Sequence, residues 1–243
     1  MKQFADLHLR VPLKDAEKTE RMIQKAKELG YSTIGISLPF NVRKEQIGYL
    51  KQICGEAKLD FVTRVDLSPR NSNELLSELR KCRRKFEVVA VRCDSKDVAR
   101  QAAKDRRVDL LQFSVTNNRK RFFDEQEAEL ASQALAALEI DMAPMLQLTS
   151  FSRIRLLSAL RMEVATAERA DVPVVLSSGA TKEQLMRGHH DFAALATIFD
   201  MSLSSALKAL SEIPREIVGR NRSKLSPDYV APGIRVVRRR SID

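Results

Sequence analysis

The sequence predicts an α/β fold, an imperfect TIM-like (β/α) barrel of seven or eight parallel strands with extra C-terminal helices. Its 243 residues are an ordinary length for one such barrel, and 44% of them are hydrophobic, enough for a full core. Short β-rich runs alternate with amphipathic stretches almost from end to end, as parallel strands joined by crossover helices do. Their even spacing favours a closed barrel over an open, doubly wound sheet.

Seven strands are expected, each a short apolar run followed by a helical pattern. They span residues 4–9, 33–38, 60–65, 87–92, 108–113, 141–146 and 172–177. The pattern then continues as helices, with apolar faces over 192–199 and 203–210. Closure of the barrel through an eighth strand therefore stays open.

The stretches between the strands carry apolar residues at the spacing of one helix face. These faces are Met22, Ile23, Ala26 and Leu29; Leu75, Leu76 and Leu79; Val98, Ala99, Ala102 and Ala103; and Ala128, Ala131, Leu135 and Leu138. Ser95 and Asp124 are expected to cap helix N-termini, and Gly30 to end the first helix.

No linker rich in Pro, Gly or Ser interrupts the pattern, so we expect a single barrel domain over residues 1–222. Ser-Pro, Ala-Pro-Gly and an arginine run then predict a basic, flexible C-terminal tail over 223–243. No apolar run approaches the roughly 20 residues of a membrane span, and the N-terminus shows no signal core. Three cysteines without metal-ligand spacing predict reduced thiols and a cytoplasmic protein.

The basic charge is concentrated in particular segments. The formal net charge is +10, from 42 Lys and Arg against 32 Asp and Glu. Five bases occupy residues 80–85, three follow at 119–121, and the segment 215–243 alone carries a net charge of +5. A solvated helix face explains the 80–85 run alone equally well, but three runs together favour a nucleic-acid partner. Without Trp and with three Tyr, the chain is expected to contact phosphates rather than stack on bases.

Functional residues of a barrel lie just after its strands, and here those positions are strongly basic. They include Arg10, Arg64, Arg70, Arg92, Lys96, Asn118, Arg119, Lys120, Arg153 and Arg155. The loop 177–181, Ser-Ser-Gly-Ala-Thr, resembles a phosphate cradle in which backbone amides approach an anion. In the alternative interpretation, Ser178 or Thr181 simply caps the next helix.

Two constellations could carry catalysis. Asp6-Leu7-His8 on the first strand is how metal phosphoesterases of the polymerase-and-histidinol-phosphatase type begin their ligand set, but Arg10 stands where a second His is expected. A cation there repels a divalent metal. His189, His190 and Asp191 allow a dyad to be drawn, although a capping turn in which Asp191 opens a helix explains them better. The sequence contains no Gly-x-Ser-x-Gly, P-loop or Gly-x-Gly-x-x-Gly motif.

Taken together, the residues resemble the barrel-fold protein component of archaeal and eukaryotic ribonuclease P (ribonuclease P protein component 3) over nearly the whole chain. The resemblance rests on Asp6-Leu7-His8, the strand Val108-Asp109-Leu110-Leu111 leading to Asn118-Arg119-Lys120, Arg153-x-x-x-Leu157, Leu176-Ser177-Ser178-Gly179-Ala180, and Arg187 ahead of Asp191. The Ser-Ser-Gly-Ala loop followed by Arg-Gly-His-His-Asp-Phe is the most specific part.

The resemblance implies a noncatalytic subunit, because the family joins an RNA that itself removes the 5′ leader of precursor tRNA with magnesium ions bound at that RNA. It also implies pairing with a small ferredoxin-like protein subunit. No catalytic residue, metal ligand or cofactor is then expected in this chain. The expected RNA-binding residues are Arg92, Arg100, Arg119, Lys120, Arg153, Ser177, Ser178 and Arg187. The alternatives are a stand-alone metal-dependent phosphoesterase and a barrel that serves only as a protein scaffold.

Overall fold

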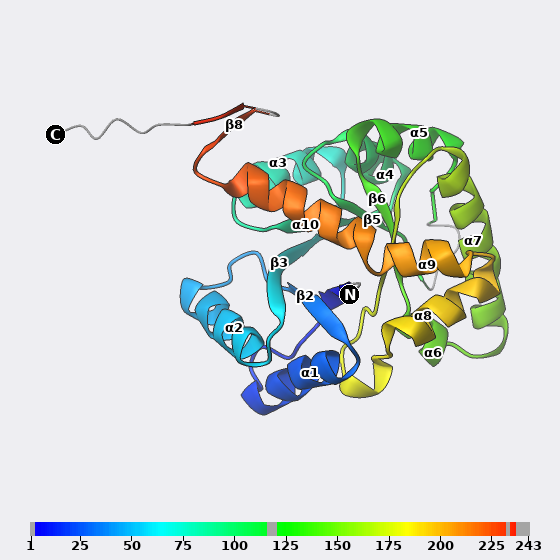
Figure 1. Cartoon of the computed structure of the whole chain (residues 1–243). Coiled ribbons are helices and arrows are strands. Elements are labelled where there is room, and N and C mark those ends of the chain that lie inside the picture. Colours follow the sequence, from blue (N-terminus) through cyan, green and yellow to red (C-terminus); the bar gives the residue numbers. More distant parts are fainter. Residues whose placement is uncertain (1–2, 116–120, 232–233, 237–243) are drawn as a thin grey trace.

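The protein is a parallel barrel (Figure 1), seen here in a computed structural model that describes residues 3–115, 121–231 and 234–236. Seven parallel strands form one sheet in which each strand pairs with the next along the chain. They are β1 (Phe4–Leu9), β2 (Tyr31–Ser37), β3 (Asp60–Leu67), β4 (Val88–Arg92), β5 (Leu110–Gln112), β6 (Ala137–Asp141) and β7 (Val174–Ser177). The predicted (β/α) barrel is confirmed.

The barrel closes between its first and last strands. Leu9 at the end of β1 forms a parallel bridge with Ala180, just beyond β7, and the Arg10 backbone N–H donates to Ala180 O at 2.9 Å. The Ser178 N–H also donates to Asp6 Oδ1 at 2.9 Å. The barrel therefore closes by direct contact between β1 and the end of β7.

Helices surround this sheet, most of them as crossovers between neighbouring strands. Their bounds are α1 (Ala16–Glu28), α2 (Lys44–Glu56), α3 (Ser72–Cys82), α4 (Lys96–Lys104), α5 (Glu125–Ala134), α6 (Ala143–Gln147), α7 (Ser150–Arg169), η2 (Glu183–Leu185), α8 (His189–Ala196), η3 (Thr197–Phe199), α9 (Leu203–Ala209) and α10 (Glu212–Leu225). The expected caps are confirmed: Ser95 and Asp124 accept from the third residue of α4 and α5, and Gly30 has a φ of +83° after α1. Only glycine adopts such a φ without strain.

Apolar side chains fill two separate regions. The larger lies between the sheet and the surrounding helices, where α1, α3 and α4 bury the faces expected from the sequence. The smaller lies inside the barrel, where Leu7, Val88 and Leu110 meet Ile217 and Val218 of α10. Figure 1 shows α10 running across the end of the barrel near the chain N-terminus. This helix closes the end at which the strands begin.

The sixth strand lies in a different place from the prediction. Residues 141–146 were expected to form it, but β6 ends at Asp141 and residues 143–147 form α6, with Pro144 in its first turn. The helix before it stops at Ala134 because Leu135 takes a left-handed conformation with a φ of 63°. Leu138 therefore belongs to the strand rather than to the predicted helix face. Alanine and leucine suit both structures, so the periodicity of this stretch was ambiguous.

The C-terminal segment continues beyond the predicted domain boundary at Arg222. α10 extends through Leu225, and β8 (Tyr229–Ala231) pairs antiparallel with β9 (Ile234–Arg235) in a separate hairpin. Among the described residues, no helix is long and apolar enough to cross a membrane. Cys54, Cys82 and Cys93 are all buried and free.

Candidate functional site

A buried arginine lies at the centre of the barrel. Arg64 on β3 is fully buried and donates from both terminal nitrogens to Glu139 on β6, each at 2.6 Å. Its Nε donates to Asp66 Oδ1 at 2.8 Å, and Nη1 also donates to the carbonyl of Leu7 at 2.9 Å. The neighbouring carboxylates raise the pKa of this guanidinium even though burial opposes the charge. The rim position predicted for Arg64 is wrong, because its side chain points into the barrel.

Gly35 on β2 lies against the β1 backbone at the carbonyl that this guanidinium contacts. A Cβ added at Gly35 would lie 2.4 Å from the Leu7 carbonyl oxygen, the same atom that accepts from Arg64 Nη1. β2 lies between β1 and β3, so the arginine must reach across it. A residue without a side chain is therefore required at this position.

His8 is held between two carboxylates beside Arg64. Its Nδ1 lies 2.7 Å from Asp141 Oδ1 and its Nε2 lies 3.1 Å from Asp66 Oδ2. Burial and Arg64 lower the pKa of His8, but the carboxylates outweigh them and raise it to about 9. The neutral ring accepts from Arg10 Nε at 2.8 Å, whereas the protonated ring donates to Asp66 instead.

The groups at the barrel centre are therefore matched in number. Three acids (Asp66, Glu139 and Asp141) face Arg64, His8 and Arg10. Arg64 and His8 hold the pKa of Asp66 well below its ordinary value against the opposing effect of burial, whereas burial raises the pKa of Asp6. Because each of these charges has an opposite partner, removing one partner alone would leave the other charge buried and unpaired.

The same groups offer one possible set of metal ligands, and it does not fit a divalent cation. Donor atoms of His8, Glu139 and Asp141 lie within 4.8 Å of one another. Glu139, however, is bound by both terminal nitrogens of Arg64, and Arg10 Nε contacts His8. A divalent ion at this point would have to displace one guanidinium and sit beside another. We derive no metal-dependent step from this cluster.

The C-terminal mouth of the barrel contains a hollow of about 240 Å³ directly above this cluster. Its lining includes Arg10, Arg92, Gln112, Arg121, Asp141 and Thr181. The side chains of Arg10 and Arg92 are 44% and 51% exposed, with one neighbouring acid each, Asp141 and Asp94. Arg121 is instead almost fully buried, with Glu163 accepting from its Nε at 2.6 Å. Two arginines of this mouth thus face solvent.

The loop 177–181 is built differently from a phosphate cradle. Gly179 has a φ of +61°, and a Cβ there would lie 2.6 Å from the carboxyl carbon of Asp141. The amides of Ser178 and Ala180 already donate to Asp6 and to Ser178 Oγ. The alternative of a helix cap is also not seen, because η2 begins after Lys182 without a side-chain cap. This loop closes the barrel instead.

The predicted RNA-binding residues that the structure describes fall into three groups. Arg92, Arg153 and Arg187 retain solvent exposure, with Arg153 Nε donating to Leu148 O and Arg187 Nη1 to two carbonyls. Ser177 and Ser178 are 0% and 1% exposed, and their hydroxyls donate to Glu139 and to the His8 carbonyl. Arg100 joins α4 to α5 through Asp124 and Glu127. Arg119 and Lys120 lie outside the described residues.

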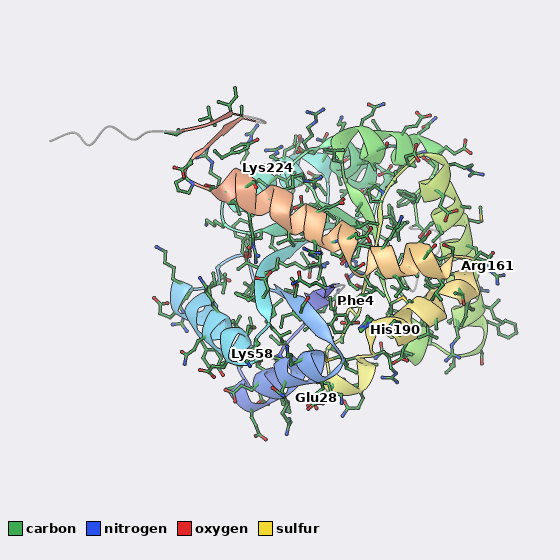
Figure 2. The ribbon with its side chains drawn as sticks, in the orientation of Figure 1. Phe4, Glu28, Lys58, Arg161, His190 and Lys224 are labelled. Carbon is green, nitrogen blue, oxygen red and sulfur yellow. The ribbon has the colours of Figure 1, made fainter. Side chains whose placement is uncertain are left out.

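His189 and His190 belong to a packed helix start. The ring of His189 stacks on Phe4, with 3.6 Å between ring centroids, and His190 lies at 6.0 Å from the same ring. Figure 2 shows Phe4 and His190 close together beside α8. Asp191 accepts from the Gly188 N–H at 3.2 Å, which confirms the capping turn, although the helix begins at His189.

Sequence reasoning missed most of the barrel centre, although a signal was present. Polar residues occur two apart in three strands, as Asp6 and His8, Arg64 and Asp66, and Glu139 and Asp141. Residues two apart on a regular strand share one face, and in β3 and β6 that face is the barrel interior. β1 has a register shift between Asp6 and Leu9, so that both Leu7 and His8 face inward. The misplaced sixth strand hid the third pair.

The protein is a closed parallel barrel whose central charged groups neutralise one another and whose mouth carries exposed arginines. Such a barrel is suited to binding a polyanion. The chain belongs to the RNase P subunit p30 family, whose model matches residues 3–226. The resemblance drawn from the sequence motifs is thus confirmed.

Relatives agree with this family, and solved structures share the fold. Ribonuclease P protein component 3 of Methanococcoides burtonii is 28% identical, over 97% of this chain and 94% of the relative; that of Methanosarcina acetivorans is 31% identical, over 71% of each. A chain from a cryo-EM structure of archaeal ribonuclease P with mature tRNA superposes with a TM-score of 0.82 at 22% identity, covering 90% of this chain and 95% of that one. A putative prolidase from Bifidobacterium longum has a TM-score of 0.64 at 10% identity, over 91% and 70% of the two chains. Both structures share the barrel fold.

Proposed function

We propose that this chain is a protein subunit of ribonuclease P that binds the catalytic RNA and supports its removal of the 5′ leader from precursor tRNA. The family match over residues 3–226 carries this conclusion. The relatives over nearly the full length bear the name ribonuclease P protein component 3. The net charge of +10 suits a phosphate-rich partner.

The barrel centre supports a noncatalytic role for the chain itself. The groups that could act as acid, base or metal ligand are each tied to an opposite charge, with Glu139 bound by Arg64 and His8 lying between Asp66 and Asp141. Chemistry then belongs to the RNA, where magnesium ions are expected. A stand-alone phosphoesterase would need those side chains free.

The exposed bases at the C-terminal mouth are the proposed contacts to RNA phosphates. Arg92 and Arg153 remain in this role, and the exposed Arg10 joins them. Arg187, whose carbonyl accepts from the Tyr31 hydroxyl at the start of β2, lies away from this mouth and stays a prediction. Arg119 and Lys120 stay predictions. Because Ser177 and Ser178 are buried, we assign them to closing the barrel between β7 and β1, and we assign Arg100 to joining α4 with α5.

The proposed partners extend beyond the RNA. As the family resemblance implies, we propose pairing with a small ferredoxin-like protein subunit, contact with precursor tRNA only through the assembled particle, and a cytoplasmic location. Buried, unpaired cysteines agree with a reducing compartment.

Leader cleavage in a reconstituted system tests the function. The cognate RNA and the remaining protein subunits are assayed on precursor tRNA at low magnesium, with this chain added or omitted. We expect omission to lower the rate sharply and the chain alone to cleave nothing. An unchanged rate on omission would overturn the subunit assignment, and cleavage by the chain alone would favour the phosphoesterase.

A further inference from the structure

The fold gathers bases from three distant segments at the end of the barrel where the strands begin. Arg83 follows α3 and precedes β4, Arg106 follows α4 and precedes β5, and Arg220 lies on α10, which crosses this end. Arg83 Nη1 and Arg220 Nη2 approach the two carboxylate oxygens of the buried Asp109 at 2.7 and 3.3 Å. One buried acid therefore anchors two arginines from different elements.

Charge at this end is not matched, unlike charge at the barrel centre. Arg107 pairs with Asp105, and Arg222 pairs with Asp60 and Glu87. Within the described part of the chain, Arg84, Arg106 and Lys224 form no ion pair, and Arg84 and Arg106 are exposed. Lys224 and Arg106 thus lie near a pair of arginines that share a single carboxylate, and Arg84 directly follows one of that pair in the sequence.

The electrostatics of Lys224 show that these bases act on one another. Lys224 lies on the last turn of α10 (Figure 2). Partial burial lowers its pKa first, and Arg220, Arg83 and Arg106 lower it further, while Asp109 opposes them. Bases that repel one another across three segments gain from an anion that spans them.

We propose that Arg83, Arg84, Arg106, Arg220 and Lys224, here called the basic end, bind backbone phosphates of RNA at the opposite end of the barrel from Arg92. The inference rests on the proposed function, which supplies the RNA. The chain then contacts RNA at both barrel ends and holds two RNA segments apart by the length of the strands. Guanidinium groups fixed by a buried carboxylate lose little conformational freedom on binding phosphate, which favours this contact.

Two variants that remove the same charge distinguish RNA binding at the basic end from general attraction between the positive chain and RNA. The test variant is Arg84→Gln/Arg106→Gln/Lys224→Gln, which leaves Arg83 and Arg220 on Asp109 so that the fold keeps its anchors. The control variant is Lys27→Gln/Lys44→Gln/Lys51→Gln, which removes the same charge from exposed positions on α1 and α2. Thermal unfolding midpoints of both are compared with wild type before binding is measured.

Affinity for the cognate ribonuclease P RNA is then measured over a salt series. We expect the test variant to bind roughly tenfold more weakly at about 0.1 M salt, and its slope of log affinity against log salt to be shallower by about 2. The control variant should change both values only slightly. Unchanged affinity and slope in the test variant would contradict RNA binding by the basic end. Weaker binding with an unchanged slope would contradict it too.

The outcomes also distinguish a failure of this inference from a failure of the proposed function. If the wild-type chain stimulates leader cleavage and the test variant binds RNA normally, RNA binding by the basic end is rejected but the proposed function stands. If the wild-type chain neither binds RNA nor stimulates cleavage, the proposed function is rejected as well. Normal RNA binding by the test variant with lost binding to another protein subunit would identify an acidic protein surface as the partner, contrary to the proposal.

Discussion

Arginines at the centre of the barrel and at its strand-start end behave in opposite ways. Arg64 has three hydrogen-bonding acceptor groups (Glu139, Asp66 and the Leu7 carbonyl) and no exposure. Arg83 and Arg220 share one carboxylate and lie beside bases that have no ion pair among the described residues. Arginine therefore stabilises the fold at the centre, and at the strand-start end two arginines anchored on Asp109 lie beside bases that we propose contact RNA. Net charge alone does not distinguish the two uses.

Removal of Arg64 should have the largest effect on stability. In Arg64→Met, Glu139 is left as a buried carboxylate without a cationic partner and Asp66 keeps only His8, so we expect the free energy of unfolding to fall by about 3–5 kcal/mol. Denaturant unfolding measures it. The double variant Arg64→Met/Glu139→Met should recover part of the loss, because it removes both charges. A loss under about 1 kcal/mol in the single variant would mean that the centre is not held by this pair.

The pH dependence of stability should reveal the charged His8. Its folded pKa of about 9 exceeds the ordinary value of 6.5, so the stabilisation is complete below pH 6.5 and is lost as pH rises through 9. The free energy of unfolding should fall by at most about 3 kcal/mol across that window. In His8→Gln this fall should be absent. Parallel pH profiles for the two proteins would show that His8 is not charged in the folded state.

A single exposed arginine at the mouth should have a smaller effect, confined to RNA binding. In Arg92→Gln, loss of one phosphate contact should make the salt slope of RNA affinity shallower by about 1, with unchanged thermal stability. The measurement is RNA affinity over a salt series. A lower unfolding midpoint with the wild-type slope would reassign Arg92 to the fold.

Arg100 should show the opposite pattern with the smallest effect. Its side chain is 20% exposed and joins Asp124 and Glu127 across α4 and α5. Arg100→Gln should lower the free energy of unfolding by about 1 kcal/mol while leaving the salt slope unchanged. A slope shallower by about 1 with full stability would return Arg100 to the RNA-binding residues.

Most of the barrel could be predicted because its strands are short apolar runs between well-capped helices. Residues 4–9 were predicted as the first strand and form β1, and Ser95, Asp124 and Gly30 mark helix ends as expected. The sixth strand could not be predicted, since Leu135, which is 59% exposed, takes its left-handed conformation with no glycine or proline to mark the end of the helix. The spacing of Ala and Leu fits a helix both before and after Leu135.

The candidate site was less predictable, because the type of a residue does not determine whether its side chain is exposed to solvent. Arg64 and Arg92 both end or follow strand patterns, yet one fills the barrel and the other faces solvent. Ser177 and Ser178 looked like donors to phosphate, but strand closure against Asp6 and His8 buries them. The basic end likewise depends on three segments that only the fold brings together.

The most direct test of the account is leader cleavage at low magnesium by the reconstituted particle containing His8→Gln at saturating concentration, below pH 7. His8 lies at the centre of the only cluster of metal-binding residue types found among the described residues. We predict a rate equal to that with wild-type chain, far above the rate without the chain, because the barrel centre does no chemistry. A folded, RNA-bound His8→Gln chain that fails to raise the rate would contradict it.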